Sequence, residues 1–198
     1  ISDLNYERFQ NFSNEFTTEN AKQAVLSFDG PAYKALDALS FDDKDFEFAQ
    51  ENLRILSGLY GILKPLDLIQ PYRLEMGTKI QISAKEKNLY EVWKETNTIT
   101  LSNELNGGTL VNLASNEYFK SIDTKKLNGE LLTIGFKDFK NGEYKTIMTY
   151  AKFARGLMSR YLIKNKITNV DDIRGFDYEN YSFNNELSSE NEMIFTRG

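Results

Sequence analysis

The segment from Leu53 to Gly77 combines groups that can contact a phosphate with a backbone held in bends. It contains the turn Gly58-Leu59-Tyr60-Gly61 and two of the chain's three prolines, Pro65 and Pro71. Because glycine has no side chain, a Gly-x-x-Gly turn between apolar segments lets the backbone approach a nucleic-acid phosphate closely. The pattern is typical of a helix-hairpin-helix. The alternative interpretation is a helix corner whose glycines only complete the caps.

Two polar clusters follow constrained stretches of backbone and are candidate cleft residues. The first comes directly after Pro71 and comprises Tyr72, Arg73 and Glu75. The second follows an apolar run and comprises Asn112, Ser115, Glu117 and Tyr118. Polar groups at the carboxyl end of a buried strand often belong to binding sites in α/β architectures. Alternatively, Ser115 caps a short helix whose first turn contains Glu117 or Tyr118.

A third cluster is basic. In the segment 150–166, helical spacing brings Lys152, Arg155 and Lys166 together on one face, with Arg160 nearby. Basic helix faces are often simply solvated. Here the helix directly follows a predicted hairpin strand, which favours a position beside a groove.

The composition excludes several kinds of catalysis. The chain contains no cysteine and no histidine, which rules out disulfides, thiol catalysis and imidazole chemistry within it. Asp42, Asp43 and Asp45 lack the spacing of a calcium loop and are interpreted as the start of a helix. Ser115 has no histidine to activate it. We therefore assign no catalytic residue, no metal ligand and no cofactor.

The overall charge bears on possible partners. The 198 residues have a formal net charge of -5, so any binding of nucleic acid must come from a local basic patch. No apolar run approaches the length of a membrane span and no leader peptide opens the chain, so we expect a cytoplasmic protein that does not enter a membrane.

The hydrophobic pattern predicts one α+β domain over residues 1–198, with a mixed sheet flanked by helices. Helices are expected through Ala21–Leu26, from Pro31, from Asp42 or Asp43 to Tyr60, over 88–105, and over 150–166. A buried strand is expected at 109–113. Asn141-Gly142 predicts a hairpin with a type I′ turn, and the last residues are expected to form two strands around a polar turn.

Four blocks of this sequence resemble the YaaA family of bacterial peroxide-stress proteins. They are FDGPAYKAL at 28–36, ENLRILSGLYGILKPLDLIQPYRLEMG at 51–77, LVNLASNEYFKSID at 110–123 and YAKFARGLMSRYLI at 150–163. Their order and number make the resemblance specific, and it extends over nearly the whole chain. Family members begin with a strand and a Ser-Pro-Ala-Lys-Thr-like segment, and we expect this domain to lack that segment.

The resemblance implies a cytoplasmic bacterial protein that limits damage by hydrogen peroxide through iron homeostasis, keeping unincorporated iron low. It also implies a helix-hairpin-helix element at Gly58–Gly61 and a positively charged cleft that binds duplex or branched DNA. The cleft cations expected on this chain are Arg54, Lys64, Arg73, Lys152, Arg155 and Arg160. An alternative function is an enzyme that acts on a small nucleotide-like or other anionic molecule in the same cleft. The oligomeric state is not predicted.

Overall fold

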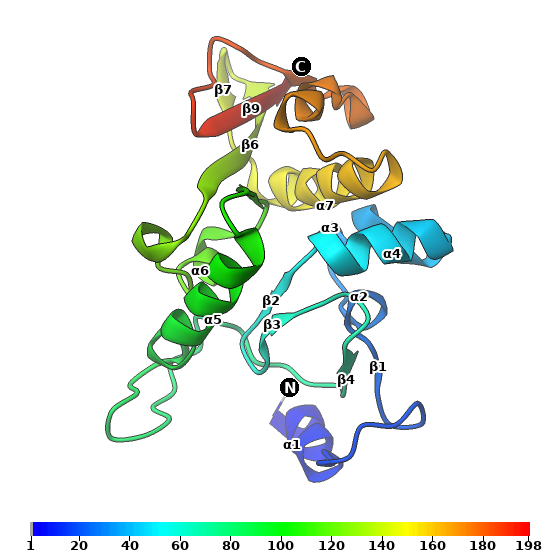
Figure 1. Cartoon of the computed structure of the whole chain (residues 1–198), viewed down its shortest axis with the longest axis vertical. Helices are drawn as coiled ribbons and strands as arrows, with labels where there is room; N and C mark the ends of the chain where they lie inside the picture. Colours follow the sequence, from blue (N-terminus) through cyan, green and yellow to red (C-terminus); the bar gives the residue numbers. More distant parts are fainter. Residues whose placement is uncertain (1) are drawn as a thin grey trace.

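The computed structural model describes residues 2–198 and shows an α+β fold (Figure 1). The α-helices are α1 (Ser2–Gln10), α2 (Ala24–Ser27), α3 (Pro31–Leu36), α4 (Asp43–Asn52), α5 (Leu89–Leu105), α6 (Asn116–Phe119) and α7 (Met148–Lys164). The strands are β1 (Lys22–Gln23), β2 (Ile55–Ser57), β3 (Gly61–Leu63), β4 (Leu68–Ile69), β5 (Thr109–Asn112), β6 (Glu130–Lys140), β7 (Glu143–Lys145), β8 (Ser182–Phe183) and β9 (Glu192–Arg197). Short 3-10 helices lie at Ala38–Ser40, Thr124–Lys126, Val170–Gly175 and Tyr178–Asn180.

The largest sheet has the order β5-β6-β9-β8, and β7 also pairs with β6. β6 is parallel to both β5 and β9, while β7 and β8 are antiparallel to their partners, so the sheet is mixed as predicted. The predicted turn joins β6 to β7, and Asn141 and Gly142 have the positive φ angles, 56° and 85°, that a type I′ turn requires.

An ion pair between buried Asp138 and partly buried Arg197 fixes one end of this sheet. The Asp138 carboxylate accepts hydrogen bonds from Arg197 Nε at 2.8 Å and from the Tyr181 hydroxyl at 2.9 Å. The Arg197 guanidinium also lies over the Tyr181 ring, 4.5 Å from its centre. Because each polar group has a partner, the charges can be buried at the end of β6 and β9.

Helix α7 belongs to both hydrophobic cores of the described chain. Ala154 and Met158 are fully buried against the sheet, in a core that includes Phe136 of β6 and Phe195 of β9. Near the end of the helix, Ile163 is part of the second core, which α2, α3, α4 and the small strands form. Figure 1 shows α7 between the large sheet and helices α3 and α4.

The close contact of α7 with α3 depends on Gly156. A Cβ atom at this position would overlap the Ala32 carbonyl oxygen and lie 2.8 Å from the Ala35 Cβ. Only glycine lets the two helix backbones approach this closely. Pro31 occupies the first turn of α3, as expected from the sequence, because its missing N–H group needs no partner there.

Most predicted elements are confirmed, but one helix ends earlier than expected. Asp42 caps α4 in a capping box with Asp45, and the helix ends at Asn52 instead of continuing to Tyr60. Residues 55–63 form the antiparallel hairpin β2–β3, in which Ile55 pairs with Leu63. The turn Gly58–Gly61 therefore joins two strands, and the predicted helix-hairpin-helix is corrected to a β-hairpin. No helix within residues 2–198 is long and apolar enough to cross a membrane.

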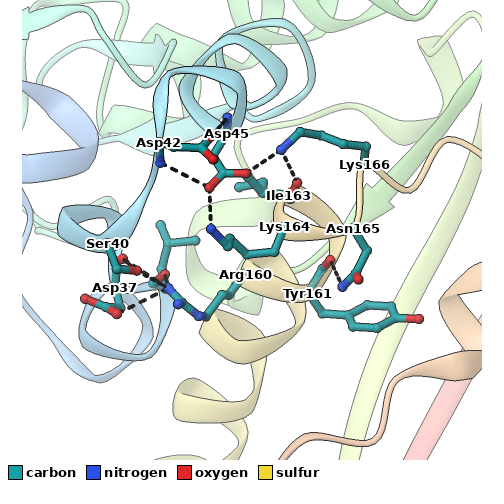
Figure 2. A network of polar contacts seen from close by, with 11 residues as sticks. Asp37, Ser40, Asp42, Asp45, Arg160, Tyr161, Ile163, Lys164, Asn165 and Lys166 are labelled. Atoms are coloured by element: carbon teal, nitrogen blue, oxygen red, sulfur yellow. Dashed lines mark hydrogen bonds and ion pairs between the residues drawn. The ribbon is translucent and has the colours of Figure 1, made fainter.

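Asp45 links α4 to the end of α7 through a buried carboxylate. Its side chain accepts hydrogen bonds from Lys164 Nζ at 2.5 Å, from Lys166 Nζ and from the backbone N–H group of Asp42 (Figure 2). Burial by itself would raise the pKa of the Asp45 carboxyl, but these hydrogen bonds outweigh it and hold that pKa well below its usual value. Lys166, predicted to join a basic binding face, is instead engaged with Asp45.

Replacing Asp45 with Asn tests this link. At pH 7 we expect Asp45→Asn to lower the free energy of unfolding by about 1.5–3 kcal/mol, the range for hydrogen bonds to charged groups. Because folding lowers the pKa of Asp45, its stabilisation is complete above the unfolded-state pKa of about 3.9 and is lost as the pH falls below it. Urea unfolding at a series of pH values should therefore show the two proteins converging below about pH 4.

Asp43→Asn is the matched control, because Asp43 lies on the same helix but is exposed and forms no ion pair with any residue in 2–198. We expect it to change stability by less than about 0.5 kcal/mol. The assigned link would be contradicted if the two variants lost the same free energy of unfolding at pH 7. It would also be contradicted if the loss for Asp45→Asn did not vary with pH.

Candidate binding site

A hollow of about 1070 Å³ lies between α1, the β1–β4 pair and the segment after β4. Four of the polar residues singled out in the sequence line it: Tyr72, Arg73, Glu75 and Tyr118. Phe28 adds an aromatic ring to its wall, and Arg8 and Lys22 add positive charges. The structure thus brings the polar cluster after Pro71 together with one member of the cluster after β5.

The segment 70–77 is held at both ends. Gln70 is buried, and its side chain accepts from the N–H group of Ser13 at 2.9 Å and donates to the carbonyl oxygen of the same residue at 2.7 Å. At the other end, the N–H group of Gly77 donates to Glu117 Oε1 at 2.9 Å, and Met76 is fully buried. These contacts fix the backbone that carries Tyr72 and Arg73, although the segment forms no helix or strand.

Tyrosine rings pack beneath this segment. Tyr72 makes edge contacts with Tyr60 and Phe28 at centroid distances of 5.3 and 6.1 Å, and Tyr33 stacks on Phe28 at 5.1 Å. Burial raises the pKa of Tyr72 to about 12, and burial also raises the pKa values of Tyr33 and Tyr118. These phenols therefore remain protonated, and hence hydrogen-bond donors, at neutral pH.

Two carboxylates stand close to this group. Arg73 forms an exposed ion pair with Glu75 at 3.4 Å, in which both side chains are more than half exposed. Glu117 and Glu75 contribute to the raised pKa of Tyr118, after the larger effect of burial. An exposed pair of this kind contributes little to stability, so Arg73 remains available to a ligand.

The two glycines of the β2–β3 turn are buried and serve packing. A Cβ at Gly58 would overlap the Leu74 carbonyl oxygen, and one at Gly61 would lie 2.6 Å from the Trp93 ring. The Trp93 indole N–H group also donates to the Gly58 carbonyl oxygen at 2.8 Å. The close approach that these glycines allow is therefore to α5 and to the segment after β4, within the protein.

Three of the candidate cations have partners inside the protein. Arg54 Nε donates to Glu104 Oε2 at 2.6 Å, and Lys64 Nζ lies 3.8 Å from the other oxygen of the same carboxylate. Arg160 donates to the carbonyl oxygens that end α3, at Leu36 and Asp37, both at 3.1 Å (Figure 2). These side chains hold elements together, and none of the three lines the hollow.

Lys152 and Arg155 differ from the other candidate cations. Neither side chain forms a hydrogen bond, an ion pair or a ring contact with any residue between 2 and 198. Lys152 is exposed, whereas Arg155 is half-buried, and burial lowers the pKa of its guanidinium. They lie on the same helix, three residues apart, and do not line the hollow.

The remaining polar candidates take structural positions near β5. Asn112 is buried at the end of the strand, and its side chain accepts from the N–H group of Ala114 at 3.0 Å. Ser115 occupies the cap position of α6 but makes no side-chain hydrogen bond to the helix. Over residues 2–198, no group of three or more acidic side chains could hold a metal ion.

Comparison with known proteins identifies the family. A family model described as peroxide stress protein YaaA matches residues 1–187. The chain belongs to this family. Among its YaaA relatives, a UPF0246 protein of Saccharophagus degradans is 54% identical over 200 residues and one of Colwellia psychrerythraea is also 54% identical over 200 residues. A third, from Acaryochloris marina, is 53% identical over 198 residues. The alignments cover 100% of this chain and 77–78% of these relatives.

Three residues at or next to the hollow were not predicted as site residues from the sequence. Ser57 fell within a predicted helix, and Phe28 and Tyr33 appeared only within the family block at 28–36. Ser57 and Phe28 contact Tyr72 across 15 and 44 positions of sequence, through a 2.5 Å hydrogen bond and a ring contact, and Tyr33 joins the group by stacking on Phe28. Because no local periodicity encodes these contacts, only the family blocks at 28–36 and 51–77 pointed to these residues.

Replacing Gly61 with Ala tests whether this glycine serves packing. We expect Gly61→Ala to lower the free energy of unfolding by about 2–4 kcal/mol, because the added methyl group meets Trp93 and the φ angle is +74°. Urea unfolding followed by tryptophan fluorescence measures the loss.

Gly142→Ala provides the control, because Gly142 has a similar φ angle of +85° but nothing within 4 Å of its added Cβ. Gly142→Ala should lower the free energy of unfolding by only about 1 kcal/mol, the contribution of backbone strain. If both variants lost the same stability, the contact with Trp93 would not be what requires glycine at position 61.

Proposed function

We propose that this protein acts in the cytoplasm during peroxide stress, binds duplex or branched DNA through cations on α7, and limits iron-driven damage. Membership of the peroxide stress protein YaaA family supports the peroxide part. The DNA part is supported by Arg155, whose half-buried side chain has no acceptor among residues 2–198. The iron part comes from the family resemblance.

Arg155 is the observation that carries the DNA proposal. A guanidinium that loses part of its hydration is costly unless it gains hydrogen-bond acceptors. Arg155 is half-buried, yet no residue of 2–198 supplies an acceptor. Its nitrogen atoms are reached by solvent. Arginine is well suited to bind phosphate oxygens in pairs, so a DNA backbone can supply acceptors where the protein supplies none.

Lys152 extends this surface by one helical turn. It is exposed and has no carboxylate partner within the described residues, so the two charges add locally although the whole chain has a net charge of -5. Since the overall charge repels DNA, binding must depend on these few contacts. Mutations on α7 should then have larger effects than the same charge change elsewhere.

The test is Arg155→Gln, measured by fluorescence anisotropy with duplex and four-way-junction DNA at several salt concentrations. We expect weaker binding at low salt and a slope of log K against log salt that is shallower by about 0.7–0.9, the value for one phosphate contact. Because phosphate contacts do not read sequence, the variant should lose affinity equally for different sequences.

Arg174→Gln is the matched control. Arg174 is exposed, and its partner is Asp171 at 3.4 Å, so the variant removes the same charge from a residue that already has a carboxylate. It should leave the salt slope unchanged. Equal effects of the two variants, or no detectable binding of either DNA by the parent chain at low salt, would refute the proposed DNA site.

The iron part needs a separate measurement in cells. In a strain that lacks its own family member and is treated with hydrogen peroxide, expression of this chain should lower the electron paramagnetic resonance signal of unincorporated iron. Expression of the Arg155→Gln variant in a parallel culture shows whether the lower iron signal requires the α7 surface. An unchanged iron signal with the parent chain would refute the proposed effect on iron and would leave the DNA proposal untouched.

A further inference from the structure

The hydroxyl protons in the hollow can be counted from the hydrogen bonds around Ser57. Ser57 Oγ accepts from the N–H groups of Leu59 at 3.2 Å and Tyr60 at 3.0 Å. A serine hydroxyl has two acceptor positions, and both are used. In its third contact, at 2.5 Å, Ser57 must therefore donate its own proton to the Tyr72 oxygen. The proton of Tyr72 has no acceptor among residues 2–198.

Tyr118 and Tyr33 are in a similar state. No residue between 2 and 198 accepts the proton of the Tyr118 hydroxyl, and the backbone N–H group of Met76 acts to lower the pKa of that phenol, against the larger effect of burial. Tyr33 has no hydrogen-bond partner of either kind in that range, and no buried side-chain oxygen there is without a partner, so its hydroxyl is reached by solvent. The region thus contains several phenol protons that no residue of the described range 2–198 accepts.

The three tyrosines belong to one region, although Tyr33 does not itself line the hollow. Tyr72 and Tyr118 both line the hollow, and Phe28 connects the rings of Tyr33 and Tyr72. After burial, the largest cause, Tyr72 and Tyr118 are the groups that raise the pKa of Tyr33. Neighbouring donors without acceptors form a site for a group that only accepts hydrogen bonds.

The charges around the hollow are compatible with an anion. Arg8 and Lys22 line it, and neither is in an ion pair within the described chain. Of the three lining carboxylates, Asp29 is paired with Lys34 and Glu75 with Arg73, while Glu19 is in no ion pair within residues 2–198. The unpaired cations Arg8 and Lys22 therefore outnumber the one unpaired carboxylate. Phe28 offers a ring for an apolar or aromatic part of the ligand.

We propose that Tyr72, Tyr118 and Tyr33 form a binding site for the oxyanion of a small aromatic acid, a phosphate monoester or a carboxylate, with its ring against Phe28. Phosphate and carboxylate share the required chemistry, because their oxygens accept hydrogen bonds and donate none. The hollow is much larger than such a molecule, so the site is the part of its wall formed by Tyr72, Tyr118 and Phe28, with Tyr33 stacked on Phe28. This inference goes beyond DNA binding, and neither proposal requires the other.

The test uses phenyl phosphate and benzoate as probes, titrated into the whole chain and followed by ligand-observed NMR in a phosphate-free buffer. For molecules of this size we expect a Kd of about 1 mM for at least one probe. The preferred probe identifies whether the site takes phosphate or carboxylate. Tyr72→Phe and Tyr118→Phe should each weaken binding about tenfold, because each removes one donor and keeps the ring.

Tyr161→Phe is the matched control. The Tyr161 hydroxyl donates to the Asp172 carbonyl oxygen at 3.2 Å, outside the hollow, so its loss should leave probe binding unchanged. Thermal unfolding of each variant shows whether it is folded, and two separate variants keep the test valid if one is not. The proposal is overturned if neither probe binds at about 10 mM, or if the hollow variants bind as well as Tyr161→Phe.

Loss of probe binding and loss of DNA binding are distinguishable. Arg155→Gln should bind phenyl phosphate or benzoate normally, because Arg155 does not line the hollow. Likewise, Tyr72→Phe should keep the salt slope of DNA binding. If Arg155→Gln abolished probe binding while Tyr72→Phe preserved it, the oxyanion site would lie on α7, and the tyrosine assignment would be wrong.

Discussion

The close approach of α7 to α3 is the contact on which the rest of the structure depends. Gly156 lets the helix backbones meet, so that a single helix contributes to both hydrophobic cores. Asp45 and Arg160 add polar links at the same junction, joining α4 and the end of α3 to the last turns of α7. Because α7 is fixed from two sides, the side chains on its remaining surface project from a rigid support.

Hydrogen-bond accounting separates structural polar groups from candidate binding groups in this protein. Buried polar groups normally have partners, and Asp45, Asp138 and Gln70 follow this rule. Arg155 and the hydroxyl proton of Tyr72 do not find acceptors among residues 2–198. Arg155 is not distinguished by its charge alone, since Arg54 and Arg160 have the same charge and are engaged within the protein. The number of hydrogen-bond partners therefore identifies candidate binding residues that residue type alone does not identify.

The sequence predicted the elements that depend on local signals. Asp42, Pro31 and Asn141-Gly142 marked two helix starts and a turn correctly, because caps and turns act within a few residues. The helical spacing that ends at Leu53 continued by coincidence through Leu56 and Tyr60, which concealed the β2–β3 hairpin. The polar clusters after Pro71 and β5 were recognised, yet only Tyr118 of the second reaches the hollow. The engagement of Lys166 by Asp45 spans 121 positions, beyond any local pattern.

The pairing of β6 with β9 has a consequence for folding kinetics. Thr133 pairs with Glu192, so this parallel contact closes a loop of nearly sixty residues, whereas β2 and β3 are joined by three. Closing a long loop loses chain entropy before its contacts form, and proteins rich in such contacts fold slowly. The hairpin and the helices of the first half can form early, while completion of the large sheet sets the time needed to reach the native state.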